Sequence, residues 1–362
     1  MINYAPNRTK PQTADQKRTI AVLFGGTSSE YEVSLQSAAA VIDHIDPAAY
    51  HVVLLGITKA GHWMRFLGTT DQIRSDTWET ASHPAIISPD RHTHGLLELT
   101  PEDVKITRLD AALPILHGTC GEDGTVQGLL ELAGIPCIGC GCLASALCMD
   151  KDAAHKLAAS VGIRVPESVV LTHMGSSEWL AARTGHLTYP LFVKPVNAGS
   201  SFGITKVTDP EKLPDAAVNA FSYDTSIIIE EEIEGFEVGC AILGTDHLLA
   251  GAVDEIELSD GFFDFTEKYH LHTSKIHMPA RIDEVTARRI QETAKLLYRT
   301  MHCSGFARVD CFLTPHGEIV FNEINTIPGF TDHSRFPNMM KGAGLSFSEL
   351  IHTMIEEAFI HE

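Results

Sequence analysis

Residues 305–329 read Gly-Phe-Ala-Arg-Val-Asp-Cys-Phe-Leu-Thr-Pro-His-Gly-Glu-Ile-Val-Phe-Asn-Glu-Ile-Asn-Thr-Ile-Pro-Gly. Two apolar runs with strand character flank the sequence Thr-Pro-His-Gly at 314–317. Pro at the second position and Gly at the fourth are typical of a type I turn. The stretch therefore predicts a β-hairpin whose strands carry several polar side chains.

A two-residue loop in this hairpin would set Arg308 opposite Glu323. It would also set Asp310 opposite Phe321. Because side chains alternate faces along a strand, one face would then carry Arg308, Asp310, Glu323 and Asn325. Two close carboxylates repel unless a cation lies between them, and carboxylate and amide oxygens on rigid strands suit Mg²⁺. The alternative is a hairpin whose solvent face happens to be acidic, and the hairpin by itself favours neither interpretation.

Length and charge bound the class of protein. The chain has 362 residues, of which 44% are apolar and 20% charged, so we expect two or three domains with well-formed cores. A formal net charge of −20 argues against binding to nucleic acid or to an anionic membrane, which needs concentrated Lys and Arg. No apolar run has the length of a signal peptide or a membrane span, so we expect a disordered tail over residues 1–18 and a soluble, cytoplasmic protein.

Eight cysteines in a chain of this length do not indicate a disulfide framework. Cys137, Cys140, Cys142 and Cys148 cluster, which raises the alternative of a zinc site. The run lacks a second spaced pair and lies among Gly, Ile and Leu. Buried thiols in a reducing compartment are therefore the favoured interpretation.

Strands alternate with helices in the first part of the chain. Strand-like runs at 19–24, 51–57 and 111–116, with a helix over 34–45, indicate a doubly wound parallel sheet, whereas residues 60–110 show no clear pattern. The strand-to-helix turns of such a sheet carry ligand sites. The expected units are the tail at 1–18, an α/β substrate-binding domain at 19–139, a central domain at 140–233 and a catalytic domain at 234–362.

Lys194 ends a predicted strand and precedes Gly-Ser-Ser-Phe-Gly at 199–203. Glycines let the backbone approach a phosphate, amides and the Ser200 and Ser201 hydroxyls can donate to it, and the lysine supplies charge. The alternative is a flexible Gly-Ser hairpin.

A second Gly-rich turn, His-Gly-Thr-Cys-Gly-Glu-Asp-Gly at 117–124, follows the strand at 111–116. Such a turn can bind a substrate ammonium. Asp123 could instead cap the next helix, but that role does not need His117 or Glu122.

Three further features are ambiguous on their own. Glu30 lies in the first strand-to-helix turn and could receive an amino group, although acids at helix starts are routine. The aromatic loop 261–272, which carries Lys268 and Tyr269, indicates a lid or an interface. The acidic run 230–237 is typical of a solvated strand end.

Together and in this order, these motifs resemble the ATP-grasp D-alanyl-D-alanine ligase family. The run His117-Gly-x-x-Gly-Glu-Asp-Gly-x-x-Gln-Gly matches the family's first signature and residues 305–329 match its second. The resemblance extends from Ile20 to the C-terminus. It implies an α/β, three-domain ATP-grasp fold in which a doubly wound N-terminal domain precedes two α+β domains that clamp ATP.

The resemblance also implies a role for each site residue. Contacts to ATP are expected from Lys151, Lys194, Ser201, Glu231, Ile233, Glu237 and Lys268. The residues expected around the first substrate are Glu30, His117 and Glu122, with Ser200 and Tyr269 closing the lid. Two Mg²⁺ ions, or Mn²⁺ in their place, would be held by Asp310, Glu323 and Asn325. The oxyanion site and the second substrate's carboxylate would be served by Arg308, Gly329 and Ser334.

The implied reaction activates D-alanine as an acyl phosphate, which the amine of a second D-amino acid attacks to give a peptidoglycan precursor. The segments 261–281 and 331–337 look like those of the D-alanyl-D-serine ligases of vancomycin resistance, whereas His117-Gly-Thr is common in housekeeping ligases. We therefore expect D-serine as acceptor, with D-alanine also used and with Asp254 as partner of the serine hydroxyl. Asn197 and Asp332 depart from the Arg and Ser usual in relatives.

Alternatives stay open at this level. They are a housekeeping D-alanyl-D-alanine ligase, another ATP-grasp carboxylate–amine ligase and a non-catalytic nucleotide-binding protein. The resemblance further implies a homodimer, and neither nucleic acid nor membrane is an expected partner.

Overall fold

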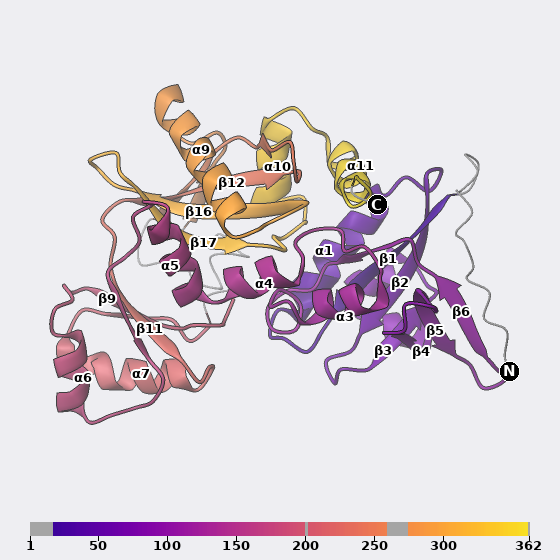
Figure 1. Ribbon diagram of the computed structural model, residues 1–362, viewed down its shortest axis with the longest axis horizontal. Coiled ribbons are helices and arrows are strands. Elements are labelled where there is room, and N and C mark those ends of the chain that lie inside the picture. Colours follow the sequence, from indigo (N-terminus) through magenta and orange to yellow (C-terminus); the bar gives the residue numbers. More distant parts are fainter. Residues whose placement is uncertain (1–16, 200–201, 259–273, 361–362) are drawn as a thin grey trace, which may run out of the picture.

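A seven-stranded mixed sheet forms the N-terminal part of the molecule (Figure 1). The structure is a computed structural model and describes residues 17–199, 202–258 and 274–360. The central elements of this sheet and its helices are β1 (Arg18–Gly25), α1 (Tyr31–His44), β2 (Tyr50–Ile57), β7 (Ala111–Pro114) and α3 (Thr125–Ala133). Strands β2 and β7 pair in parallel with β1 on its two sides.

Residues of β1 alternate between the two faces of this sheet and bury both. Ile20 and Val22 pack in one core with residues of α1, whereas Ala21 and Leu23 pack in another with residues of α3. Helices therefore cover both faces, and the predicted doubly wound parallel arrangement is confirmed for β2, β1 and β7.

The segment 60–110, for which the sequence predicted no pattern, extends this sheet with antiparallel strands. Its elements are β3 (Trp63–Phe66), α2 (Thr70–Arg74), the 3₁₀ turn η1 (Trp78–Ala81), β4 (Ser82–Ile87), β5 (Gly95–Leu99) and β6 (Val104–Arg108). The full strand order is β6-β5-β4-β3-β2-β1-β7. Mixed pairing thus replaces the all-parallel sheet that the flanking strands suggested.

A four-stranded antiparallel sheet follows, in the order β10-β9-β11-β8. Its elements and the two helices before it are α4 (Cys142–Met149), α5 (Lys151–Ser160), β8 (Ser168–Leu171), α6 (Ser177–Thr184), β9 (Leu191–Pro195), β10 (Thr205–Val207), η2 (Pro210–Lys212), α7 (Leu213–Phe221) and β11 (Ile227–Glu231). Apolar residues of α6 and α7 bury one face of this sheet. The opposite face is left for the next layer.

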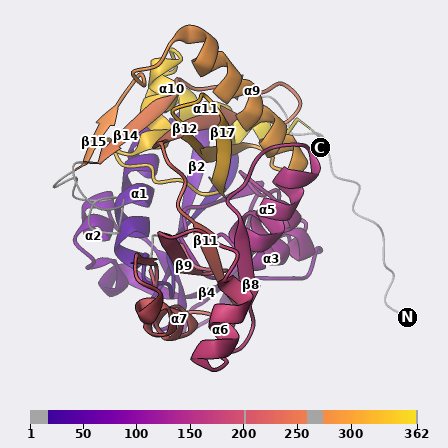
Figure 2. The same cartoon turned by 90° about the vertical axis from the view of Figure 1, so that its left-hand side faces the viewer.

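The C-terminal sheet has the order β15-β14-β12-β16-β17, with a short β13 beside β12. Its elements and helices are β12 (Phe236–Leu243), β13 (Leu249–Ala250), β14 (Asp254–Leu258), β15 (Ser274–His277), α9 (Glu284–Thr300), β16 (Phe306–Leu313), β17 (Ile319–Asn325), α10 (Arg335–Gly342) and α11 (Phe347–Glu357). Residues of α9 pack in one core with β12, β16 and β17. Seen from the side, β9 and β11 lie below β12 and β17, with α5 alongside (Figure 2). The three sheets follow the order of the three predicted domains, whose boundaries stay predictions.

The hairpin β16–β17 confirms the shared polar face but corrects the predicted register. Thr314 N–H donates to the carbonyl of Glu318 (3.0 Å), so the loop has three residues, and its last one, Gly317, adopts φ +76°. A type I turn followed by a left-handed residue is the usual three-residue loop. A bulge between Asp310 and Cys311 then shifts the pairing so that Asp310 lies opposite Glu323.

The predicted pairings were therefore wrong in detail. Arg308 lies opposite Asn325, not Glu323, and Phe321 lies opposite Cys311 instead of Asp310. The loop is one residue longer than predicted and the bulge adds one more residue on β17. These two single-residue shifts add up to an even number, which is why the polar side chains still share one face.

Two members of the predicted cysteine cluster are buried thiols, and a further buried cysteine, Cys303, lies against one of them. Cys140 and Cys148 are buried, and Cys148 Sγ lies 3.7 Å from the Sγ of Cys303. Cys137 and Cys142 are half-buried. Within the described part of the chain, no three His, Cys, Asp or Glu side chains are grouped to hold a metal ion, and no helix is long and apolar enough to cross a membrane.

Candidate active site

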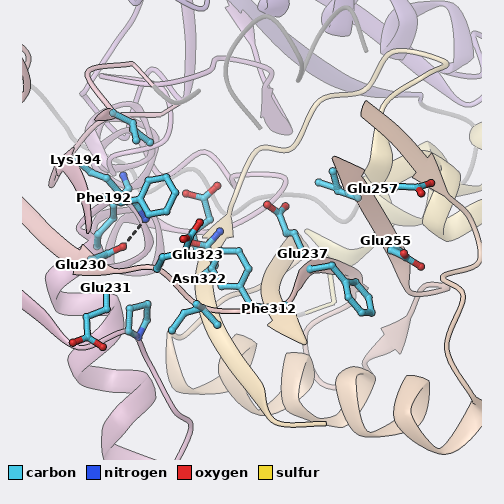
Figure 3. A pocket seen from close by; sticks show the side chains of 18 of the residues that line it. Phe192, Lys194, Glu230, Glu231, Glu237, Glu255, Glu257, Phe312, Asn322 and Glu323 are labelled. Carbon is cyan, nitrogen blue, oxygen red and sulfur yellow. Dashed lines mark hydrogen bonds and ion pairs between the residues drawn. The ribbon is translucent and has the colours of Figure 1, made fainter. Parts of the chain in front are cut away.

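A cavity of about 400 Å³ opens between the four-stranded and six-stranded sheets (Figure 3). Residues of β9 and β11 on one side and of β12, β14, β16 and β17 on the other supply its walls. Residues predicted to contact ATP or metal that line it are Lys151, Lys194, Glu231, Ile233, Glu237 and Glu323. The structure therefore brings this part of the predicted site together. Ser200, Ser201, Lys268 and Tyr269 lie outside the described residues.

Two lysines form the cationic side of the cavity. Lys151 begins α5, where Asp150 caps the helix by accepting from the Ala153 N–H (2.9 Å). Its Nζ donates to the carbonyl of Ala198 (2.6 Å), which ties the helix start to the loop after β9. Lys194 Nζ lies 2.5 Å from Glu230 Oε2. Two ammonium groups on one side of a cavity are suited to phosphate.

Glu323, on the acidic face of the hairpin, lines the other side, and Asp310 and Asn325 lie beside it without lining the cavity. Asp310 is 1% exposed, and its carboxylate accepts from Arg308 Nε (2.9 Å) and from Asn325 Nδ2 (2.9 Å). Asn325 Nδ2 also lies 3.4 Å from Glu323 Oε1, so the amide sits between two carboxylates. Turning that amide by 180° would present its oxygen instead. The donor set of two carboxylates and an amide oxygen fits the ligands of Mg²⁺.

Arg335, at the start of α10, lies in the segment 331–337 that the sequence singled out, but no role of its own was predicted for it. Its guanidinium donates to Asp254 through Nε (2.7 Å) and a terminal nitrogen (2.8 Å), and it contacts Glu237 Oε1 (2.8 Å). It also lies 3.2 Å from Asp310 Oδ1. Burial opposes the charge on Arg335, but the carboxylates around it hold its pKa well above the usual value. One cation thus joins β12, β14, β16 and α10.

This network changes the interpretation of Asp254, the predicted partner of an acceptor hydroxyl. Asp254 is fully buried, and its two oxygens accept from Arg335 and from the Gly239 N–H (3.0 Å). Its immediate partner is therefore a guanidinium. Asp254 and Arg335 lie 81 positions apart, and no local pattern signals the contact.

The two Gly-rich turns of the N-terminal sheet gather the predicted residues for the first substrate. Glu122 accepts from the Gly118 N–H (2.8 Å) and from the Ile327 N–H (3.2 Å), which links this turn to the segment after β17. Burial, together with the nearby carboxylate of Glu30, raises the pKa of Glu122 to about 8. Burial also lowers the pKa of His117 to about 4, so its imidazole is neutral at neutral pH.

Glu30 lies where three segments meet. It is 5% exposed at the start of α1, and a Cβ added at Gly199 would lie 2.8 Å from its Oε2. A Cβ at Gly118 would lie 2.6 Å from the same oxygen. The phosphate-loop region and the turn after β7 thus both approach Glu30 through glycines.

Gly329 and Ser334 lie together beyond the hairpin. A Cβ at Gly329 would lie 2.8 Å from Ser334 Oγ, and that hydroxyl accepts from the Thr331 N–H (2.9 Å). Ser334 immediately precedes Arg335, so the predicted carboxylate contact adjoins the arginine network. Asn197, the departure noted in the phosphate loop, donates to Asp224 (3.0 Å) instead of carrying a charge.

Two sheets that clamp a cavity between lysines and an acidic hairpin define the ATP-grasp fold. Models of the D-ala D-ala ligase N-terminus and C-terminus match residues 19–140 and 157–356. The chain belongs to the D-alanyl-D-alanine ligase family, whose members are ATP-dependent enzymes.

Similar proteins cover nearly the whole chain. The solved VanG D-Ala:D-Ser ligase from Enterococcus faecalis is 54% identical, with a TM-score of 0.88 over 95% of this chain and 100% of that one. Vancomycin B-type resistance protein VanB from Enterococcus faecalis is 45% identical over 94% of this chain and 98% of its own length. A D-alanine–D-alanine ligase from Caldicellulosiruptor bescii is 40% identical over 94% and 95%.

Proposed function

We propose that this chain uses ATP to join D-alanine to a second D-amino acid, preferably D-serine, through a D-alanyl phosphate. The observation that carries the proposal is a cavity lined by Lys151 and Lys194 on one side and by Glu323 of β17 on the other. Charge of both signs around one cavity is what a triphosphate with its counter-ion needs. The dipeptide would serve as a peptidoglycan precursor.

In the first step, an oxygen of the D-alanine carboxylate attacks the γ-phosphorus of ATP and ADP leaves. Lys151 and Lys194 would offset the charge of the phosphates. Mg²⁺ bound by Asp310, Glu323 and Asn325 would supply Lewis-acid stabilisation of that charge. Glu30 would hold the D-alanine ammonium.

In the second step, the amine of the acceptor attacks the carbonyl of D-alanyl phosphate and phosphate leaves. The Arg308 guanidinium and the Gly329 N–H would stabilise the oxyanion that forms on the carbonyl oxygen. Asp310 orients Arg308 for this task, because three of its contacts with the guanidinium are 2.9 Å or shorter. Ser334 would accept the carboxylate of the acceptor.

D-serine is the acceptor that we propose, at the polar wall beside Ser334. Arg335 immediately follows Ser334 in the chain and is hydrogen-bonded to the buried Asp254, so this pair would shape the wall that the serine hydroxyl faces. The similar VanG enzyme is named a D-Ala:D-Ser ligase. D-alanine would also react, because Asp254 and Arg335 are already paired with each other and stay paired when the acceptor lacks a hydroxyl. The need for ATP supports a cytoplasmic location.

A homodimer is the oligomeric state that we propose, through an apolar face on the antiparallel strands β4–β6. On this face, Leu97 of β5 lies between Ile86 of β4 and Ile106 of β6. Beside it, Leu99 of β5 pairs with Val104 of β6. Ile106 is 60% and Val104 51% exposed. The same patch on a second copy would bury both, as a two-fold interface requires. Ile106→Glu should yield a monomer by sedimentation velocity, and an unchanged dimer would place the interface elsewhere.

Release of phosphate from ATP and Mg²⁺ tests the activity. We expect little release with D-alanine absent and rapid release with D-alanine plus D-serine. D-lactate in place of D-serine should add nothing to the release that D-alanine alone supports. Absence of release with every pair of D-amino acids would refute the proposed function.

A further inference from the structure

His155 lies behind the nucleotide cavity without lining it. It stands four residues after Lys151 on α5, so both side chains share one face of the helix. The ring is 4% exposed and packs edge-on against Phe321 of β17 (5.8 Å between centroids). A buried imidazole between the two sheets of the clamp has no role in the steps above.

Both ring nitrogens of His155 face hydrogen-bond acceptors. Nε2 lies 3.0 Å from the carbonyl oxygen of Asn322 on β17, and Nδ1 lies 3.6 Å from Glu230 Oε1 on β11. A neutral imidazole has one N–H, so it can donate to only one of them. Nδ1 and Glu230 Oε1 are both buried and neither makes another hydrogen bond within the described residues. One more proton could therefore be bound between His155 Nδ1 and Glu230 Oε1.

The charged groups that surround the His155 imidazole are Glu230, Lys194 and Lys151, which line the nucleotide cavity. Burial lowers the pKa of His155, Glu230 opposes this effect, and Lys194 on β9 and Lys151 on α5 add to it. On β17 the adjoining group is the Asn322 carbonyl, with Glu323 next in the chain. Glu230 is now balanced by Lys194, at 2.5 Å. Phosphate groups beside the two lysines would cancel their charge at the imidazole.

We propose that His155 is a positioning residue that takes up a proton when nucleotide binds. The proton comes from solvent to Nδ1, which then donates to Glu230 Oε1 while Nε2–H continues to donate to Asn322. Glu230 thereby keeps a cationic partner when Lys194 binds the phosphates. The protonated His155 on α5 then links β11 to β17 around the bound nucleotide. This inference rests on the proposed nucleotide role of Lys194.

The test is calorimetric titration of the whole protein with MgADP in two buffers of different ionisation enthalpy. Near pH 7.5 we expect the wild type to take up about one proton per nucleotide bound. His155→Gln keeps an amide donor for the Asn322 carbonyl but cannot be protonated, so its proton uptake should be close to zero. His186→Gln, on the exposed end of the four-stranded sheet domain, should match the wild type.

A second readout separates this role from a purely structural one. In the pH range where binding takes up a proton, the Kd of the wild type for MgADP should rise by up to about tenfold for each unit by which the pH is increased. His155→Gln should be folded, should bind more weakly and should lose this pH dependence. Equal proton uptake in wild type and His155→Gln would overturn the inference while leaving the proposed function intact. Failure of the wild type to bind MgADP at all would instead overturn the proposed function.

Discussion

Asp310 and Glu323 lie directly opposite each other on β16 and β17, and a bulge after Asp310 creates this pairing. Below the bulge, Cys311 pairs with Phe321 and both are buried in the core. Continuing that register would have set Asn322 opposite Asp310. The bulge skips one residue and so aligns two carboxylates on the cavity side. Bulges are common where a strand must re-aim a side chain at a site.

The first prediction concerns Glu323 as a ligand of Mg²⁺. Glu323→Gln removes one anionic oxygen from the acidic face, and we expect kcat to fall at least about 100-fold. The fold should persist, because the amide has nearly the same shape. Steady-state kinetics with a circular dichroism melt checks both points.

The matched control for this variant is Glu318→Gln on the same hairpin. Glu318 is exposed and pairs with Arg164 at the surface, away from the cavity. Its substitution should leave kcat unchanged. Near-normal activity of Glu323→Gln would refute the proposed metal site.

The second prediction concerns the buried pair Arg335–Asp254. Arg335→Met leaves the carboxylates of Asp254 and Asp310 without their shared cation, which should cost about 3–5 kcal/mol of folding stability. Adding Asp254→Leu removes a buried carboxylate and should recover part of that loss. Urea unfolding of the two single variants and the double variant gives the coupling energy. Strictly additive losses would contradict a direct interaction.

The third prediction uses the close approach of Gly199 to Glu30. Gly199→Ala would push a methyl group onto Glu30 Oε2, at 2.8 Å before relaxation. We expect the KM for D-alanine to rise about tenfold or more, corresponding to about 1.4 kcal/mol, and to rise more than the KM for ATP. Gly128→Ala on α3 is the control, since its added Cβ meets only Cys142 Sγ at 3.6 Å. Equal changes in both KM values would place Glu30 outside the D-alanine site.

The fourth prediction concerns the pH dependence of stability through Glu122. Its pKa is raised to about 8 in the folded state from an ordinary value of 4.5. Between these pH values the folded protein holds a proton that the unfolded chain has released, so stability falls as pH rises through this window. Glu122→Gln should lessen this fall in the free energy of unfolding by at most about 1.4 kcal/mol per pH unit. The free energy of unfolding of both proteins is measured in urea at pH 5.5 and at pH 8. An equal change between these pH values in wild type and Glu122→Gln would contradict the raised pKa.

The sequence was sufficient for the parallel core of the first sheet and for the shared polar face of the hairpin. Both follow from short-period apolar patterns and from turn residues. The register was not predictable, because Asp310-Cys311 carries no mark of a bulge. The role of Arg335 was not predictable for a related reason: although the segment 331–337 was singled out, its contact with Asp254 forms only in the tertiary fold. The antiparallel strands at 63–108 are short and interrupted, so alternation alone did not reveal them.

Product composition tests the central claim most directly. The enzyme should be given ATP, Mg²⁺ and equal amounts of D-alanine and D-serine, and the dipeptides should be quantified by mass spectrometry. We predict that D-alanyl-D-serine exceeds D-alanyl-D-alanine and that one ADP forms per dipeptide. D-alanyl-D-alanine as sole product would contradict D-serine as acceptor, and ATP hydrolysis without any dipeptide would contradict the ligase itself.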